Sequence, residues 1–347
     1  MKKIISLLMA LLLSLTLSAS ALAADPVEEE NAAWTLYHLG LFRGTDTDSE
    51  GFPVFSLDDA LTRAQGVTML VRLLGQEEAA LEGNWETPFL DVPDWAAPYV
   101  GYAYENELAT GRDETTFDPN TRLSATEYLT FVLRALGYQS GKDFVWDAAW
   151  KLSDRIGLTD GSYHEETNQT FDRGDAAVIS ANALDTKQKN KKQTLGEKLA
   201  EQGIATDAQR CLWTESCESI QPDQIWFSFT ALADSPEVYA SFVVDSVTAN
   251  GVPCQITQYT TAKEVKAFRE EQELAESYLK DCFALTCLDY DEKAALEAAP
   301  ASVVQGGIEY PVLEFRFRCT GTLADGTETS EIFLLKSYIA GYGGPLV

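Results

Sequence analysis

Three short phrases decide the fold of the first half of this chain: LTRAQ at Leu61–Gln65, LSATE at Leu123–Glu127 and FDRGD at Phe171–Asp175. In each, an apolar residue precedes a residue suited to cap a helix, and a glutamine or an acidic residue follows three positions later. This spacing forms a capping box, in an acidic variant in the last copy, and an apolar run follows it each time. The phrases predict three helix starts at domain-scale intervals, which indicates a repeated unit.

The middle copy is the clearest of the three repeats. It begins FLDVPDWAAPYVGYAYENELATG at Phe89–Gly111, and the turn residues Asp118–Asn120 precede its second helix. Apolar residues at helical spacing predict that both parts are amphipathic helices. Each copy runs helix, glycine turn, extended loop and capped helix, and one such unit is too small to bury its own apolar faces. We therefore expect residues 24–185 to form an all-α domain of three repeats, at about 30–77, 86–138 and 142–185.

These residues resemble the S-layer homology domain family. The resemblance is closest in the middle copy, through the F-x-D-V opening at Phe89–Val92, the pair Trp95–Ala96, and the glycine loop that leads to Phe117 and Pro119. The flanking copies lack a full F-x-D-V start, and the resemblance covers roughly residues 30 to 185. It implies a pseudo-threefold bundle of helical repeats that binds secondary cell-wall polysaccharide. In many family members the ligand end carries a pyruvate ketal, and hence a carboxylate.

The resemblance also suggests which residues bind that ligand. A helix start offers free amides and the positive end of the helix dipole to an anion, and an arginine adds a planar fork of donors. Arg63 and Arg173 occupy the family's arginine position in two phrases, whereas Ala125 stands there in the middle copy. Arg112 and Arg43 are further candidates, because each lies beside the glycine of a loop. The full predicted ligand-binding set is Arg63, Arg173, Arg112, Gly111, Asp91, Trp95, Gly44 and Arg43.

Each of these residues also has a structural interpretation. Arg63 and Arg173 could instead form structural ion pairs. For Trp95 packing between helices is favoured, and for Asp91 a helix cap is favoured. The loop glycines are expected to serve backbone turns first, with close approach of a ligand as a second possibility.

The N-terminus has the features of an export signal. Lys2 and Lys3 precede an apolar stretch over residues 4–17, and residues 21–23 read A-L-A, which predicts a signal peptide over residues 1–23. We expect no membrane span after cleavage, and a location in the cell wall or S-layer surface of a bacterium. The formal net charge is −28 and the isoelectric point is about 4.3, which excludes a general nucleic-acid role, because such proteins need a basic face. No cofactor motif is present.

The second half is predicted to be a separate domain. The polar segment TKQKNKKQT, within residues 186–194, is interpreted as a linker, and residues 195–347 as an α+β domain with an antiparallel sheet and one long helix at Thr261–Leu288. Asn250–Gly251 predicts a hairpin turn, with CQITQYT as its return strand. A short helix is expected over residues 195–204, and further strands over residues 225–232, 238–248, 311–320 and 329–339.

The function of that second domain is left open between three classes. All six cysteines lie in it, which allows up to three disulfides or a set of thiols, and the absence of any C-x-x-C pair or histidine there disfavours a metal site. The two histidines, His38 and His164, fall in the repeats, so this half alone cannot build a histidine-based nucleophile system. We expect a noncatalytic binding or structural domain. The alternatives are an anchored glycan hydrolase and a cysteine-based redox or metal module.

Overall fold

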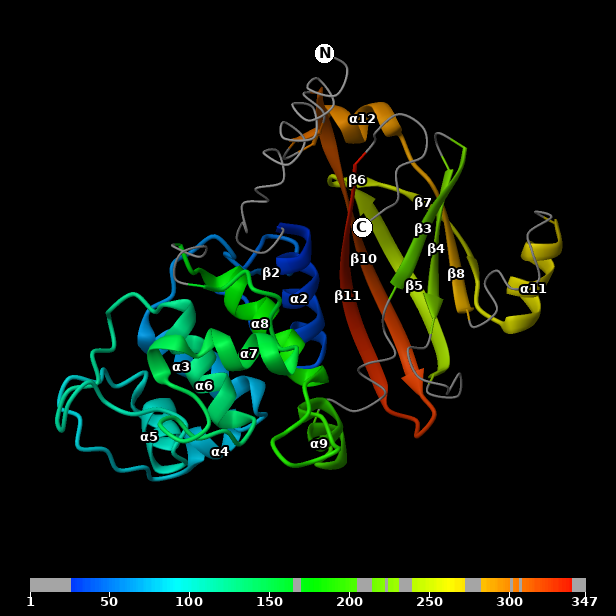
Figure 1. The fold of residues 1–347 in the computed structure, drawn as a ribbon. Helices are drawn as coiled ribbons and strands as arrows, with labels where there is room; N and C mark the ends of the chain where they lie inside the picture. The colour runs from blue at the N-terminus through cyan, green and yellow to red at the C-terminus, as the bar shows by residue number, and fades with distance from the viewer. Residues whose placement is uncertain are drawn as a thin grey trace, which may run out of the picture. The chain divides into compact units, whose positions relative to one another are not determined.

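The computed structural model describes residues 26–164, 170–204, 214–221, 224–230, 239–271, 282–299, 302–305 and 308–338. The chain forms two compact units, Met1–Ala205 and Thr206–Val347. The first consists mainly of helices and the second mainly of strands (Figure 1). Among the described residues, no helix is long and apolar enough to cross a membrane. The predicted signal peptide, residues 1–23, lies outside the described residues.

The first unit contains eight described α-helices, one 3-10 turn and one small sheet. The helices are α2 (Pro26–His38), α3 (Arg63–Leu73), α4 (Glu77–Glu82), α5 (Ala97–Glu105), α6 (Ala125–Ala135), α7 (Trp150–Ile156), α8 (Arg173–Asp185) and α9 (Leu195–Glu201), with the turn η1 at Trp146–Ala148. Strands β1 (Asp46–Thr47) and β2 (Pro53–Val54) pair antiparallel in the first loop. The sequence predicted an all-α domain. The unit also contains this small sheet, because the loop closes on itself through backbone hydrogen bonds.

The three predicted helix starts are confirmed. Thr62, Ser124 and Asp172 cap α3, α6 and α8, and each forms a reciprocal capping box with Gln65, Glu127 or Asp175. Each box satisfies backbone donors that the first helical turn leaves without an intrahelical partner.

A second piece of geometry also recurs three times. Gly40, Glu107 and Gly157 all have left-handed backbones, with φ of 71°, 58° and 76°. After each, two successive amides donate to one carbonyl: Leu41 and Phe42 to Leu36, Leu108 and Ala109 to Ala103, Leu158 and Thr159 to Ser153. The same turn thus leads out of α2, α5 and α7 and into the loop that precedes a capped helix.

The segment predicted as a linker, residues 186–194, belongs to the first unit. Thr186 and Gln188 are buried, and Lys187 pairs with Thr194 across a tight loop. The ammonium group of Lys189 lies 2.6 Å from the carboxylate of Asp143. The compact units divide between Ala205 and Thr206, beyond the predicted short helix, which is present as α9.

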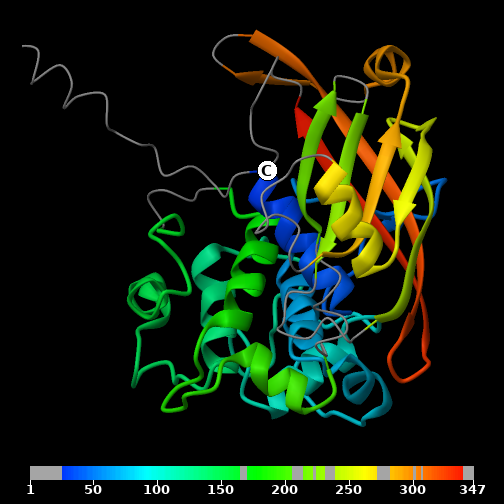
Figure 2. The same cartoon turned by 90° about the vertical axis from the view of Figure 1, so that its right-hand side faces the viewer.

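The described residues of the second unit form two antiparallel sheets and two short helices, α11 (Ala262–Glu271) and α12 (Glu292–Glu297). Its strands are β3 (Thr214–Gln221), β4 (Gln224–Thr230), β5 (Tyr239–Ala249), β6 (Val252–Pro253), β7 (Gln255–Tyr259), β8 (Cys282–Asp289), β9 (Ser302–Gln305), β10 (Ile308–Leu323) and β11 (Glu328–Tyr338). One sheet has the order β11-β10-β5-β6, with β9 also on β10, and the other β3-β4-β8-β7. Figure 2 shows β10 and β11 as the long orange and red pair.

Residues from both sheets build the core of this unit. Phe242 and Val247 on β5, Phe315 and Phe317 on β10, and Leu288 on β8 belong to one buried cluster. On β10 the cluster residues Leu313, Phe315, Phe317 and Cys319 lie at alternate positions, which fits the period of two that predicted a strand over residues 311–320.

The hairpin prediction is half correct. Asn250 and Gly251 both have positive φ, 48° and 80°, and join β5 to β6, as a two-residue hairpin turn requires. The return strand ends at Pro253, however, and the CQITQYT segment that follows it forms β7, which pairs with β8 of the other sheet. The side-chain amide of Asn250 explains the fixed turn, because it donates to the carbonyls of Ala295 and Val312.

The prediction of one long helix over Thr261–Leu288 is wrong. Helix α11 is described over Ala262–Glu271, and Cys282–Asp289, within the predicted helix, is the strand β8, paired on both sides with β4 and β7. Ala284, Leu285 and Thr286 are all buried, so this strand lacks the alternation that marks a half-exposed strand. A short continuous apolar run cannot be told from a buried helical segment by periodicity.

Candidate functional site

Arg63, at the first position of α3, reaches into the loop of the middle copy. Its Nε donates to the carbonyl of Phe117 at 3.1 Å, and one terminal nitrogen donates to the carbonyl of Thr110 at 2.7 Å. The other lies 3.1 Å from a carboxylate oxygen of Glu127. The residue is only 5% exposed, and burial lowers the pKa of its guanidinium to about 10, which leaves it charged at neutral pH.

Arg173, at the first position of α8, bonds two carbonyls in the loop of the first copy as Arg63 does in the middle copy, but its remaining terminal nitrogen lies 3.8 Å from the sulfur of Met69 and not beside a carboxylate. Its Nε donates to the carbonyl of Phe55 at 2.8 Å, and a terminal nitrogen donates to the carbonyl of Arg43 at 2.6 Å. Burial likewise lowers its pKa to about 10. Both arginines therefore bond the residue before a loop glycine and a phenylalanine seven positions before the next helix cap. We call these two contact regions the α3 junction and the α8 junction.

Backbone groups complete both junctions. At α3 the amides of Arg63 and Ala64 donate to the carbonyls of Thr121 and Pro119 in the next copy's loop. At α8 the amides of Arg173 and Gly174 donate to those of Asp59 and Leu57. With the capping box holding the third amide, the first turn of each helix has no amide left for an anion. The expectation of free helix-start amides at these two helices is therefore wrong.

Arg112 is the accessible arginine of the α3 junction. Its side chain is 38% exposed, and a terminal nitrogen lies 2.5 Å from the same Glu127 oxygen that Arg63 contacts. Its Nε is 3.7 Å from Asp118, whose side chain is 41% exposed. Glu127 thus lies between a buried and a half-exposed guanidinium. The outer one can exchange its partner for a ligand carboxylate without opening the core.

Arg43 is an accessible arginine beside the α8 junction, where its carbonyl, like that of Thr110, accepts from the buried arginine. Its side chain is 62% exposed and contacts Glu77 at 2.7 Å. Glu77 also accepts hydrogen bonds from Arg72 and from the hydroxyl of Tyr99. Burial alone would raise the pKa of Glu77, but these hydrogen bonds and charges lower it below its ordinary value. The carboxylate therefore stays charged and holds Arg43 at the rim.

The loop glycines are required by the loop itself. A Cβ on Gly111 would lie 2.6 Å from the carbonyl oxygen of Asp113 and 2.7 Å from that of Thr116, and one on Gly44 2.8 Å from that of Asp46. Neither has a positive φ, so close backbone approach, and not the turn conformation, excludes a side chain. The role is therefore steric, and the favoured interpretation, that these glycines serve a turn conformation, is not supported at Gly111 and Gly44.

Asp91 and Trp95 differ from their favoured structural interpretations. The two carboxylate oxygens of Asp91 accept from the amides of Phe117 and Asp118, at 2.8 and 2.7 Å, so Asp91 fixes the loop and does not cap a helix. Trp95 is 53% exposed and does not pack between helices. Its exposed ring remains a predicted ligand contact.

The phrase around Ala125 has no arginine to form the same junction. The loop that precedes α8 includes residues 165–169, which lie outside the described residues. Within the described part of the chain, the arginine junction is therefore formed twice.

A group of acidic side chains, which the sequence analysis did not single out, meets at the start of α8. Carboxylate oxygens of Glu29, Asp172 and Asp175 lie within 4.8 Å of one another, and Glu29 and Asp175 are buried. Gly174 permits this approach, because a Cβ there would overlap the Glu29 carboxylate. Burial, with the neighbouring charges of Asp175 and Asp58, raises the pKa of Asp172 above its ordinary value.

Replacing Asp172 with asparagine is expected to stabilise the protein at neutral pH. Because the pKa is raised on folding, the folded state binds the proton more tightly, so stability falls as pH rises from about 3.9 through the folded pKa. Asparagine caps a helix as well as aspartate. Thermal melts across pH should show a higher midpoint for Asp172→Asn at pH 7 and a difference that shrinks in acid.

Asp113→Asn provides a control of opposite sign. Hydrogen bonds from Thr115 and Thr116 lower the pKa of Asp113, so its charged form contributes stability at neutral pH that is lost in acid. A midpoint for Asp172→Asn that lies below that of the unaltered protein at pH 7 would contradict the prediction.

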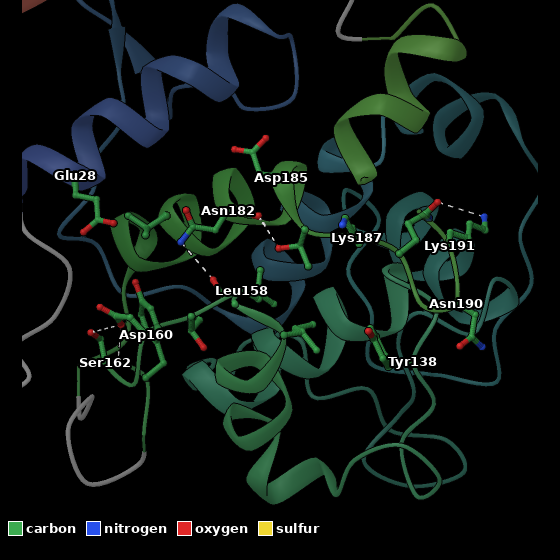
Figure 3. A pocket seen from close by; sticks show the side chains of 17 residues that line it. Glu28, Tyr138, Leu158, Asp160, Ser162, Asn182, Asp185, Lys187, Asn190 and Lys191 are labelled. Carbon is green, nitrogen blue, oxygen red and sulfur yellow. Dashed lines mark hydrogen bonds between the residues drawn. The ribbon is translucent and has the colours of Figure 1, made fainter. Parts of the chain in front are cut away.

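The first unit also contains a cleft of about 700 Å³ that no motif of the sequence predicted (Figure 3). We call it the α8 cleft, and its wall includes Tyr138, Leu158, Asp160, Tyr163, Asn182 and Lys187. Figure 3 shows Asn182 and Asp185 on α8 between an end with Glu28, Asp160 and Ser162 and an end with Asn190 and Lys191. The arginines of the two junctions do not line it.

The described cysteines do not favour redox chemistry. Cys254 and Cys287 are free thiols, and burial raises the pKa of each to about 11. A thiol with so high a pKa is almost entirely protonated at neutral pH and is a weak nucleophile and metal ligand. Cys211 lies outside the described residues, and the side chains of Cys217 and Cys282 are not described.

Comparisons with known proteins agree with this architecture. Residues 88–124 match the model of the S-layer homology domain. A cell surface protein of Thermoanaerobacter kivui is 36% identical over 193 residues, which cover 53% of this chain and 24% of that relative. A middle cell wall protein of Brevibacillus brevis is 29% identical over 196 residues, covering 53% and 18%. A surface layer protein of Brevibacillus choshinensis is 30% identical over 156 residues, covering 42% and 14%.

The chain spans about a quarter or less of the length of each of these relatives. The matched residues 88–124 contain α5, the Gly111 loop with Arg112, and the cap of α6. The match and the relatives' names indicate a location at the bacterial cell surface. This chain is therefore a cell-surface protein that carries an S-layer homology domain at residues 88–124.

Proposed function

We propose that the first unit consists of three S-layer homology repeats that anchor an exported protein noncovalently to secondary cell-wall polysaccharide. The observation that carries the proposal is the recurrence of one geometry around the matched domain. The left-handed turn and the loop that follows it lead to a capping box three times, at α3, α6 and α8, and the arginine junction occurs twice in the described residues; α9 begins with a capping box too.

In this proposal the buried arginines have a structural role and the exposed arginines bind the ligand. Arg63 and Arg173 donate hydrogen bonds to the loops of neighbouring copies and add buried positive charge beneath the protein surface. Arg112 and Arg43, with 38% and 62% of their side chains exposed, are the groups that can meet a carboxylate of the polymer, such as a pyruvate ketal. Such local sites are needed because the chain as a whole carries a formal charge of −28, which repels an anionic polymer.

The proposed site is tested by binding to purified cell-wall sacculi. We expect the mature protein to sediment with sacculi, and Arg112→Ala with Arg43→Ala to lose at least about tenfold in affinity, as for the loss of one or two charge-assisted hydrogen bonds. Because both side chains lie at the surface, far-ultraviolet circular dichroism melts should be nearly unchanged.

Arg155→Ala is the matched control, since Arg155 is also exposed on a helix of this unit but lies outside both junctions. Sacculi stripped of their secondary polymer should bind neither form. Binding that survives the double substitution unchanged would refute the assignment of the junctions.

The second unit is proposed to be a noncatalytic binding or structural module held at the surface by the first. In its described residues the histidine-based nucleophile systems are absent, as the sequence requires, and the thiols of Cys254 and Cys287 have raised pKa values. Its location at the surface follows only if the first unit anchors the chain as proposed.

A further inference from the structure

We propose that the α8 junction, with Arg43 at its rim, is the stronger of the two anion sites, because Gln65 on α3 stands where α6 has Glu127. Both residues are the third of their helix and close its capping box, but only one of them carries a charge. The inference rests on the proposed binding of an acidic polysaccharide, and it concerns which junction holds the carboxylate more tightly.

The two buried arginines face the same stretch of a neighbouring helix. Arg63 lies 3.1 Å from Glu127 and 5.2 Å from the ring centroid of Phe131, four residues further along α6. Arg173 has a terminal nitrogen 3.8 Å from the sulfur of Met69, which occupies the same place in α3, four residues after the third residue of the capping box. Where the α3 junction has a carboxylate, the α8 junction therefore offers a weak sulfur acceptor.

At the α3 junction a ligand carboxylate would meet two carboxylates of the protein. Glu127 lies 2.5 Å from Arg112 and 3.1 Å from Arg63, and Asp118 lies 3.7 Å from Arg112. Two guanidinium groups are thus balanced by two carboxylates. An anion that binds Arg112 comes close to both of these negative charges, and like charges repel.

At the α8 junction the arginines outnumber the carboxylates with which they pair. Glu77 lies 2.7 Å from Arg43 and 2.9 Å from Arg72, and Arg173 forms no ion pair with the described residues. An anion can draw Arg43 away from Glu77 at little cost, because Arg72 and the hydroxyl of Tyr99 continue to donate to that carboxylate. The exposed guanidinium of Arg43 is thus available to a ligand beside two further positive charges.

Neighbouring charges act on the two buried arginines in opposite directions. Burial is the main reason that the pKa of each is lowered, and the next-largest influence differs. For Arg63 it is the charge of Glu127, which raises the pKa, and for Arg173 it is the charge of Arg72, which lowers it. Asp59 raises the pKa of Arg173, but by less than Arg72 lowers it. Positive charge that is not already paired attracts an anion at the rim more strongly.

Isothermal titration calorimetry on the full mature chain tests this order of affinities. The probe is a methyl hexoside that carries one pyruvate ketal, because a polymer that engages both junctions at once would hide the difference between them. We expect Arg112→Ala to bind the probe within about twofold of the unaltered protein. Arg43→Ala should bind it at least about fivefold more weakly, as for the loss of a charge-assisted hydrogen bond.

Gln65→Glu gives the α8 junction the residue that α6 already has. Its folding is not in question, because Gln65 is exposed and glutamate closes the same capping box in α6. We expect affinity for the probe to fall at least about threefold from the added negative charge. Gln202→Glu is the matched control, since it makes the same change at an exposed position at the end of α9, outside both junctions, and should leave affinity unchanged.

Two results would overturn the proposal. One is a loss in Arg112→Ala as large as that in Arg43→Ala, and the other is an equal effect of the two glutamine-to-glutamate substitutions. A probe that does not bind the unaltered protein would overturn it as well, in its ligand class.

The sacculus assay separates this proposal from the anchoring function. If Arg112→Ala with Arg43→Ala lost sacculus binding while the two single variants bound the probe equally, the junctions would stand and their order would fail. If the double substitution left sacculus binding intact while Arg43→Ala alone weakened binding of the probe, the order would stand and anchoring through the junctions would fail.

Discussion

Replacing Arg63 with alanine is expected to destabilise the first unit by about 3–5 kcal/mol, the usual cost of removing one partner of a buried ion pair. The substitution removes three contacts at once, to Glu127, Phe117 and Thr110. It leaves two carbonyls without their donor in a region where the arginine was only 5% exposed. It also removes the guanidinium from the ring of Phe117, whose centroid lies 4.9 Å away. Chemical unfolding followed by far-ultraviolet circular dichroism reports on this unit, because it holds most of the helices.

Arg112→Ala is the matched control for this prediction, because it removes the other arginine from the same carboxylate. With a side chain that is 38% exposed, Arg112 should contribute less than about 1 kcal/mol to stability. Arg63→Ala therefore tests a contact between copies, and Arg112→Ala tests a residue proposed to bind the polysaccharide. If both cost the same, the buried hydrogen bonds of Arg63 would not contribute as we infer.

Replacing Gly111 with alanine is expected to cost about 3 kcal/mol and to abolish binding to sacculi. The added methyl group would overlap the ring of Phe89 and lie 2.6 and 2.7 Å from the carbonyl oxygens of Asp113 and Thr116. Backbone oxygens of a tight loop cannot move aside as a flexible side chain can, so the strain falls on the loop. The amide of Arg112 donates to the displaced carbonyl of Thr116, so the accessible arginine moves with it. Denaturant unfolding and the sacculus assay measure the two effects.

Gly141→Ala tests whether the cause is steric. Gly141 has a φ of +80°, and no atom lies within 4 Å of a Cβ placed there, so only conformational strain of about 1 kcal/mol is expected. Binding should persist in this variant. The steric argument would be untenable if Gly111→Ala were the milder of the two substitutions.

Features fixed by neighbours in sequence could be predicted without the structure. Ser124 and Glu127 lie three positions apart and satisfy each other's backbone amides, so the cap is a local property. The turn at Asn250–Gly251 follows from the ease with which those two residues adopt positive φ. The position of Arg63 in its phrase marked it as a candidate binding residue. Its structural role depends on the distant carbonyls of Phe117 and Thr110, to which it donates hydrogen bonds.

The failures share one physical reason, which is that contacts between distant segments overrode the local pattern. The apolar run at Cys282–Asp289 suits a helix or a buried strand, and pairing with β4 and β7 decided for the strand. The polar segment 186–194 looked like a linker, yet the ion pair between Lys189 and Asp143 ties it to the first unit. The α8 cleft has no motif, because its walls come from several separate segments, from Glu28 and Tyr138 to residues 156–163 and 178–191.

By itself, the sequence determined where three capped helices of the first half begin, and that this half resembles S-layer homology domains. These properties follow from spacings of a few residues, where the chain has little freedom. Only the tertiary structure decided that Arg63 and Arg173 are buried between copies while Arg112 and Arg43 remain accessible. Burial depends on what the rest of the chain places around a side chain, and three five-residue phrases cannot specify it.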